Sequence, residues 1–272
     1  MKRFIIAAGL LPGLVACATI STQQEVQMGE QYAAQINAQL PIIQDPEVNR
    51  YINVLGDSIA KLSDDRNLDW HFYVVDSKEV NAFAVPGGFI YVNRGLIERA
   101  DKMDQLAGVL GHEIGHVTNR HTVKLMEKQQ GANVGVALGC ILTKVCENQA
   151  TGALINLTGN AVFAKFSRED EAEADESGVR YVTRAGIDPR GIPEMFQKLI
   201  DERGSKPAGV ETWFATHPLE EDRIADTQAM IKKIDPAILA TLTQDSPNFQ
   251  AFKARVKSLP PTPAPKGASG SR

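Results

Sequence analysis

The sequence feature that most constrains the fold is a pair of histidines four residues apart, His112 and His116 in "GHEIGH". On an α-helix this spacing places both imidazoles on one face, about 5–6 Å apart at Cβ. Apolar residues precede the pair with helical spacing, from Met103 to Leu110. The stretch therefore predicts an amphipathic helix that presents two nitrogen ligands to one metal ion.

Glu113 follows the first histidine and lies beside the metal face. The H-E-x-x-H arrangement is typical of zinc peptidases, in which the glutamate accepts a proton from water instead of binding the ion. The pattern alone is only moderately specific, because a histidine on a helix is more often structural. A catalytic zinc site also needs a third protein ligand.

His121 is the nearest candidate for that ligand, but it comes one residue too early for the metzincin spacing, and Asn119 stands where that motif has glycine. We expect His121 to be a surface or supporting residue. In "FSREDEAEADESG", Glu171 and Asp175 share a helix face, so one can bind the metal while the other accepts the N–H of a ligating imidazole. The alternative is a solvated acidic face, which is our expectation for the remaining acids Glu169, Asp170, Glu173 and Glu176.

These motifs together resemble peptidase family M48 over roughly residues 20–235, through "HEIGH", "SREDEAEADESG", "NAFAVPGG" and "THPLEEDRI" in the family's order. The resemblance implies a mainly helical α+β metalloendopeptidase domain of the zincin-like kind, with a small β-sheet or hairpin beside the active-site cleft. It also implies one Zn²⁺ per chain. The roles it assigns are zinc ligands for His112, His116 and Glu171, general base for Glu113, and partner of a ligating histidine for Asp175.

The resemblance gives roles to two further motifs. The first motif, "NAFAVPGG", is expected to be an edge strand to which an extended peptide substrate adds as another strand. The alternative is a plain sheet edge. In the second motif, "THPLEEDRI", His217 would stabilise the oxyanion, or it would occupy the open zinc position and keep the enzyme inactive. Arg223 would orient the site or bind the oxyanion; a capping or surface role is the alternative for both. The edge strand comprises Asn81, Ala82, Phe83, Ala84 and Val85.

Local patterns complete the fold prediction. Strands do not alternate with helices, which argues against a doubly wound α/β fold. Proline at the first helical position after Asp45 marks one helix start. We expect helices over Gln23–Leu40 and Pro46–Leu62, a strand over Trp70–Asp76, a hairpin over Asn81–Asn93, and mainly helix from Met103 to about Lys257, including a helical hairpin over Gly131–Val162.

Residues 1–16 are expected to be a lipoprotein signal peptide. Lys2 and Arg3 precede an apolar run too short to span a membrane comfortably, and "LVAC" ends in Cys17, which resembles the lipidated cysteine of the bacterial lipobox. A plain secretory signal is the alternative. Ala18 stands where an aspartate would resemble an inner-membrane retention signal. We therefore expect a lipid-anchored protein of the outer membrane that faces the periplasm.

Residues 17–257 are expected to form the peptidase domain, followed by a disordered Pro/Gly/Ser-rich tail over 258–272. An exported protein meets an oxidising compartment, so Cys140 and Cys146 are candidates for a disulfide. Six residues of continuous helix would separate them by about 9 Å, more than a disulfide spans, so a bridge needs a turn between them. Two free thiols are the alternative.

Two functions are consistent with these features. The first is a zinc endopeptidase that cleaves unfolded or misassembled envelope proteins. The second is a gated or non-catalytic lipoprotein that assists the outer-membrane assembly machinery. Glu113 favours the enzyme, because a closed structural zinc site does not need it. The expected partners are therefore envelope proteins and outer-membrane lipid, whereas a net charge of −4 gives no reason to expect nucleic acid.

Overall fold

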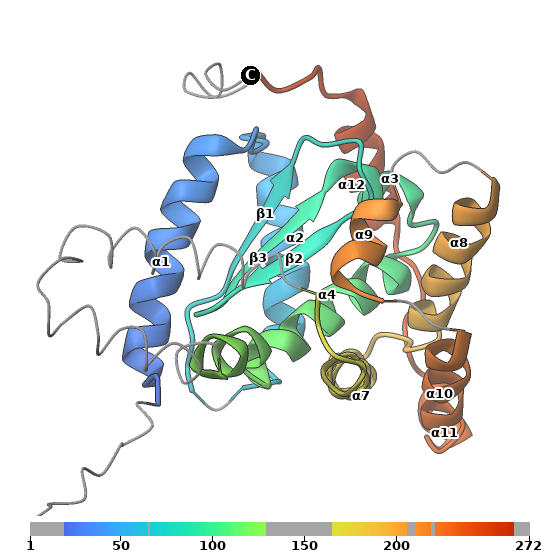
Figure 1. Cartoon of the computed structure of the whole chain (residues 1–272). Helices are drawn as coiled ribbons and strands as arrows, with labels where there is room; N and C mark the ends of the chain where they lie inside the picture. The colour runs from blue at the N-terminus through green and yellow to red at the C-terminus, as the bar shows by residue number, and fades with distance from the viewer. Residues whose placement is uncertain (1–18, 65, 129–164, 206–209, 219–220, 264–272) are drawn as a thin grey trace, which may run out of the picture.

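The computed structural model describes residues 19–64, 66–128, 165–205, 210–218 and 221–263. This part of the chain forms a mainly helical α+β domain with one three-stranded sheet, which confirms the predicted fold class (Figure 1). Within it, no helix has the length and apolar character needed to cross a membrane. The predicted signal peptide, Cys17, Cys140, Cys146 and the predicted hairpin over 131–162 lie outside the described residues.

The first two helices begin at recognisable capping residues. α1 covers Thr22–Gln39 and α2 covers Pro46–Ala60. The Asp45 side chain accepts hydrogen bonds from two main-chain N–H groups of the first turn of α2, and Pro46 needs no such acceptor. The capping by Asp45 therefore confirms the predicted start of α2.

The sheet has the strand order β1-β3-β2, with β1 over His71–Val75, β2 over Ala82–Val85 and β3 over Phe89–Asn93. β2 and β3 form the predicted antiparallel hairpin, whereas β1 pairs with β3 in parallel. The hairpin turn contains Gly87 and Gly88 at φ of 84° and 102°, a region that favours glycine. The sequence pattern predicted the strands and the hairpin but not the parallel pairing.

The two faces of the sheet pack against different helices. α1 covers one face, where its Ala33 packs with Phe83 and Tyr91. The other face carries Ala82 and Ala84 and joins the main core with α2 and α4. Figure 1 shows α1 on one side of the sheet, with α8 and α10 beyond α4 on the other. One face of the sheet therefore packs against α4.

The remaining helices form the C-terminal part of the domain, and residues 121–128 are also helical. Past α12 the chain still makes contacts: Arg94 donates to the carbonyl of Leu259, and the Thr262 N–H donates to Asp76. Residues 264–272 of the predicted tail lie outside the described residues. The helices are α3 (Arg94–Arg99), α4 (Met103–Thr118), α7 (Arg168–Arg184), α8 (Gly191–Ser205), α9 (Glu211–Thr216), α10 (Glu221–Ile231), α11 (Pro236–Leu239) and α12 (Pro247–Ser258).

Asp104, in the first turn of α4, supports a prediction about stability and pH. Its side chain is fully buried, neither carboxylate oxygen has a hydrogen-bond partner among the described residues, and burial raises its pKa from 3.8 to about 6. The folded chain therefore holds this proton more tightly than the unfolded chain, and stability is lost as pH rises from about 4 to 6. We expect Asp104→Asn to raise the free energy of unfolding by on the order of 2–3 kcal/mol at pH 7. Denaturant unfolding at pH 7 and pH 4 checks this, and an equal gain at both pH values contradicts it.

Candidate metal centre

The H-E-x-x-H motif lies in the most buried helix of the described chain. Every residue of α4 from Met103 to Val117 is buried. His112 and His116 point the same way, and their Nε2 atoms lie 3.0 Å apart. Burial holds the pKa of His116 well below its usual value, so this ring is neutral and suited to binding a metal.

α7 approaches this helix closely enough to add acidic side chains. A Cβ at Gly115, inside the motif, would lie only 2.9 Å from the carbonyl oxygen of Ala174, so glycine permits the close contact. The acidic first turn of α7 is also favourable at a helix N-terminus. Consequently Glu171 and Asp175 reach His112 from the facing helix.

Four side chains meet at one point. Their ligand atoms all lie within 4.8 Å of one another, and each side chain is at most 1% exposed. The two Glu171 oxygens lie 3.5 Å and 3.6 Å from the Nε2 atoms of His116 and His112. His217 Nδ1 lies 3.1 Å from Glu171 Oε1. The group consists of His112, His116, Glu171 and His217.

Hydrogen bonding around this group shows that it fits a cation. His112 Nδ1 lies 2.9 Å from Asp175 Oδ1, so Nδ1 carries the proton and Nε2 turns a lone pair to the centre. A carboxylate oxygen and further imidazole nitrogens converge on the same point. Buried electron-pair donors facing one another without a cation are costly. Imidazole with carboxylate is a ligand set that Zn²⁺ accepts.

Glu113 lies beside the four ligands but is not one of them. It is fully buried, and neither carboxylate oxygen has a hydrogen-bond partner among the described residues. His217 Nε2 is 3.5 Å from Oε1, longer than a normal hydrogen bond. Burial raises the pKa of Glu113, which makes it a stronger base. These properties match the predicted general base.

Arg223 joins the two acids of α7. Its Nε and Nη2 donate to both oxygens of Asp175 at 2.8 Å and 2.7 Å, and Nη1 donates to Glu171 and to the carbonyl of Pro218. Burial opposes ionisation of Asp175, but His112 and Arg223 outweigh it and lower its pKa. Of the two roles predicted for Arg223, the geometry favours orienting the site.

His217 fills the fourth position of the group. It caps the C-terminus of α9, its main-chain N–H donating to the carbonyl of Trp213 at 2.8 Å, and its ring stacks on Trp213 at 4.5 Å between centroids. Burial alone would lower the pKa of His217, but the carboxylates of Glu171 and Glu113 raise it. Of the two predicted roles, this placement favours occupation of the open position.

Some supporting residues were not found from the sequence. Phe166 stacks on the ring of His116 at 4.0 Å, and Trp213 on that of His217. The Trp213–His217 spacing of four residues on a helical pattern was the available signal. Of the two positions expected for His121, surface or supporting, the structure shows the supporting one, because His121 is buried against His116. Glu173 is half exposed, as expected, yet it also contacts His121.

The predicted substrate strand, residues 81–85, lies at one edge of the sheet and packs against α4. Asn93 N–H donates to the Asn81 carbonyl, so in this antiparallel pair the odd-numbered residues bond to β3. The main-chain groups of Ala82 and Ala84 therefore face away from β3, and no main-chain bond joins them to another described element, but both residues are buried, at 0% and 6% exposed. At the opposite edge, the amide of Asn53 pairs with both main-chain groups of Phe72 and blocks that strand.

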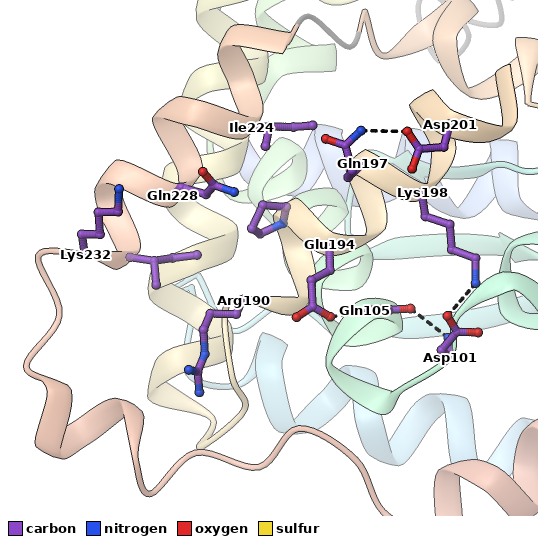
Figure 2. Close-up of a pocket in the computed structure, with 12 residues that line it drawn as sticks. Asp101, Gln105, Arg190, Glu194, Gln197, Lys198, Asp201, Ile224, Gln228 and Lys232 are labelled. Carbon is purple, nitrogen blue, oxygen red and sulfur yellow. Dashed lines mark hydrogen bonds and ion pairs between the residues drawn. The ribbon is translucent and has the colours of Figure 1, made fainter. Parts of the chain in front are cut away.

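A separate cavity of about 640 Å³ lies between α8 and α10, away from the metal centre. Figure 2 shows its lining, in which Lys198 is paired with Asp101 and Gln197 with Asp201. None of the four converging side chains, and neither Glu113 nor Arg223, lines it. The cavity therefore has no part in the chemistry of the metal centre.

The site combines a helix bearing H-E-x-x-H, a glutamate of the ligand group from a second helix, and a buried glutamate without a hydrogen-bond partner among the described residues. These features define the class of zinc metalloendopeptidases. The comparison with known families specifies the group: residues 44–231 match Peptidase family M48, and the chain belongs to this family. The resemblance seen in the sequence is thereby confirmed, as is zinc as the cofactor.

Curated relatives come from bacteria and eukaryotes. The chain is 36% identical over 269 residues to the beta-barrel assembly-enhancing protease of Escherichia coli (strain K12), covering 94% of this chain and 53% of the relative. It is 29% identical over 192 residues to the mitochondrial metalloendopeptidase OMA1 of Danio rerio (68% and 40%), and 31% identical over 157 residues to the metalloprotease LoiP of Escherichia coli (56% and 59%). The chain thus spans about half the length of the first of these relatives.

Proposed function

We propose that this protein is a zinc-dependent endopeptidase that cleaves unfolded or misassembled envelope proteins. The observation that carries the proposal is the buried carboxylate of Glu113, which has no hydrogen-bond partner among the described residues and lies beside the converging ligands His112, His116 and Glu171. A purely structural zinc site has no use for such a base. The family membership of the chain supports the same chemistry.

The residues divide the reaction between them. His112, His116 and Glu171 would hold the zinc ion, which when bound would supply Lewis acidity for a peptide carbonyl and for the attacking water. Glu113 accepts the proton of the attacking water and delivers it to the leaving amine. The raised pKa of Glu113 suits both halves of this transfer, because it brings the carboxyl closer to the working pH. Asp175 keeps His112 in the tautomer that binds metal.

The substrate is an extended segment that pairs with β2. The main-chain groups of Ala82 and Ala84 that face away from β3 are the donors and acceptors such a segment needs. Because both residues are buried, pairing requires that this edge first be uncovered. A folded protein presents few unpaired extended segments, whereas an unfolded or misassembled one presents many. Because main-chain pairing carries little sequence information, this mode supports broad selection of unfolded chains.

His217 makes the enzyme gated. Its buried ring lies among the three ligands, where it would occupy the position that a substrate needs beside a bound metal. Displacement of α9 by a substrate or partner would open that position. This gating supports the second function, assistance in outer-membrane protein assembly, because the enzyme would not cleave proteins while His217 occupies the open position. The name of the Escherichia coli relative, a beta-barrel assembly-enhancing protease, supports that context.

The proposed location is the periplasmic face of the outer membrane. Its support is the sequence "LVAC" with Ala18 after it, which resembles the lipidation site of an outer-membrane lipoprotein at Cys17. A lipid anchor there would keep the peptidase close to newly arriving outer-membrane proteins. The expected partners are these proteins, the membrane lipid and the outer-membrane assembly machinery.

The test uses one β-barrel protein in two forms, unfolded by dilution from urea and folded in detergent micelles. We expect the purified enzyme to cleave the unfolded form only, to lose activity with a chelator and to regain it with Zn²⁺. His217→Ala should cleave faster, about tenfold for each 1.4 kcal/mol by which the closed arrangement is favoured. Equal cleavage of both forms would refute the proposed substrate class. A slower His217→Ala variant would support the oxyanion role instead.

A further inference from the structure

The two zinc-binding histidines of α4 are supported differently. His112 turns its Nδ1 to a carboxylate, Asp175, at 2.9 Å. His116 turns its Nδ1 to another imidazole, that of His121, at 2.8 Å between the two Nδ1 atoms. Both rings of this second pair are buried. A metal-binding histidine normally requires a hydrogen-bond acceptor on its other nitrogen, so His121 has to act as that acceptor.

A neutral imidazole is an acceptor at one nitrogen only, and a third residue decides which one. His121 Nε2 lies 3.2 Å from Glu173 Oε2, with Asp170 Oδ1 a second carboxylate oxygen at 3.8 Å. An ionised carboxylate only accepts hydrogen bonds, so the proton of His121 lies on Nε2, and its Nδ1 carries the lone pair. The hydrogen between the two imidazoles then belongs to His116 Nδ1. The Nε2 of His116 is left without a proton and faces the metal position.

The opposite arrangement is disfavoured by the same contacts. If His121 donated from Nδ1, its Nε2 lone pair would face the lone pairs of Glu173, and His116 would carry its proton on Nε2, at the metal position. Phe166 covers the ring of His116 at 4.0 Å, which limits its reorientation. The direction of the hydrogen bonds from His116 to His121 to Glu173 is therefore determined by geometry.

We propose that His121 is a positioning residue, which together with Glu173 holds His116 in the tautomer and orientation that bind zinc. Glu173 lies on α7, the helix that also provides Glu171, so α7 supports both histidines of α4. The inference rests on the proposed zinc centre, but it concerns metal affinity and is therefore tested apart from proteolysis.

The test compares two substitutions of nearly equal size. In His121→Asn, the side-chain oxygen takes the place of Nδ1 and still accepts the hydrogen bond, whereas His121→Leu provides no acceptor. Zinc affinity is measured by chelator competition, and ligand geometry by the visible absorption of the Co²⁺-substituted protein. We expect His121→Leu to bind zinc about 10- to 100-fold more weakly, and His121→Asn to recover most of this loss. The melting temperature of the metal-free protein serves as the measure of a merely structural effect.

Variants of Glu173 give a second test that does not alter a buried residue, because this side chain is 54% exposed. Glu173→Gln retains an acceptor oxygen and should keep zinc affinity near that of the wild type, whereas Glu173→Ala should weaken it. Wild-type affinity in His121→Leu, or equal losses in His121→Leu and His121→Asn, overturns the proposal. Equal affinities in both Glu173 variants overturn the part assigned to Glu173. A wild-type protein that binds no zinc contradicts the proposed function itself.

Discussion

Glu113→Gln is expected to lower peptide hydrolysis by about 10²- to 10⁴-fold, the contribution of a positioned general base. Glutamine has the size of glutamate but cannot accept the proton of the attacking water. The carboxylate is outside the group of ligands and has no hydrogen-bond partner among the described residues. Zinc content and melting temperature should therefore remain those of the wild type. Hydrolysis of a peptide, zinc stoichiometry and a thermal melt on the same preparation check all three expectations.

His116→Ala is the matched control for this result. It removes a ligand instead of the base, so zinc should be lost, and the melting temperature should fall because metal binding is coupled to folding. Wild-type hydrolysis in Glu113→Gln would rule out the assigned mechanism. Loss of zinc in Glu113→Gln would identify Glu113 as a ligand. The two variants together therefore separate proton transfer from coordination.

Much of the fold was predictable because its determinants are local. Asp45 followed by proline predicts the start of α2, and Gly87–Gly88 between two apolar runs predicts the hairpin. The spacing of His112 and His116 predicts their shared helix face. Each of these features depends on hydrogen bonds or side-chain periodicity within a few residues, and such information is present in any single stretch of sequence.

What the sequence left open depends on contacts between distant segments. The parallel pairing of β1 with β3 joins residues 18 positions apart, such as His71 and Phe89, and is not determined by either strand alone. The support of His116 by His121 is set by Glu173, 52 residues further along the chain. The part played by Glu171 was implied by the family resemblance, since the acidic stretch alone is also consistent with a solvated helix face.

The metal centre is buried, yet it consists mainly of polar and charged side chains. Glu113, Glu171 and Asp175 are at most 2% exposed, and among the described residues Arg223 and the surrounding histidines offset their charges. Burial opposes ionisation at all three, and nearby positive charges outweigh burial and lower the pKa only at Glu171 and Asp175. The two acids that contact Arg223 therefore stay ionised, whereas the third is held as a base.

Arg223→Ala is accordingly expected to lower the free energy of unfolding by about 3–5 kcal/mol, because it removes the guanidinium that neutralises the buried carboxylate of Asp175. Arg223 is 8% exposed and binds both oxygens of Asp175 as well as Glu171. Denaturant unfolding of the zinc-loaded protein measures the loss.

Arg255→Ala is the control, since Arg255 also pairs with a carboxylate, that of Asp45 at 2.7 Å, but its side chain is 47% exposed. Exposed pairs contribute little to stability, so this variant should unfold almost as the wild type does. If Arg223→Ala kept wild-type stability and zinc while losing hydrolysis, Arg223 would act on the oxyanion and not on the acids of α7. A large loss of stability in Arg223→Ala alone supports the orienting role, because only a buried ion pair depends so strongly on both partners.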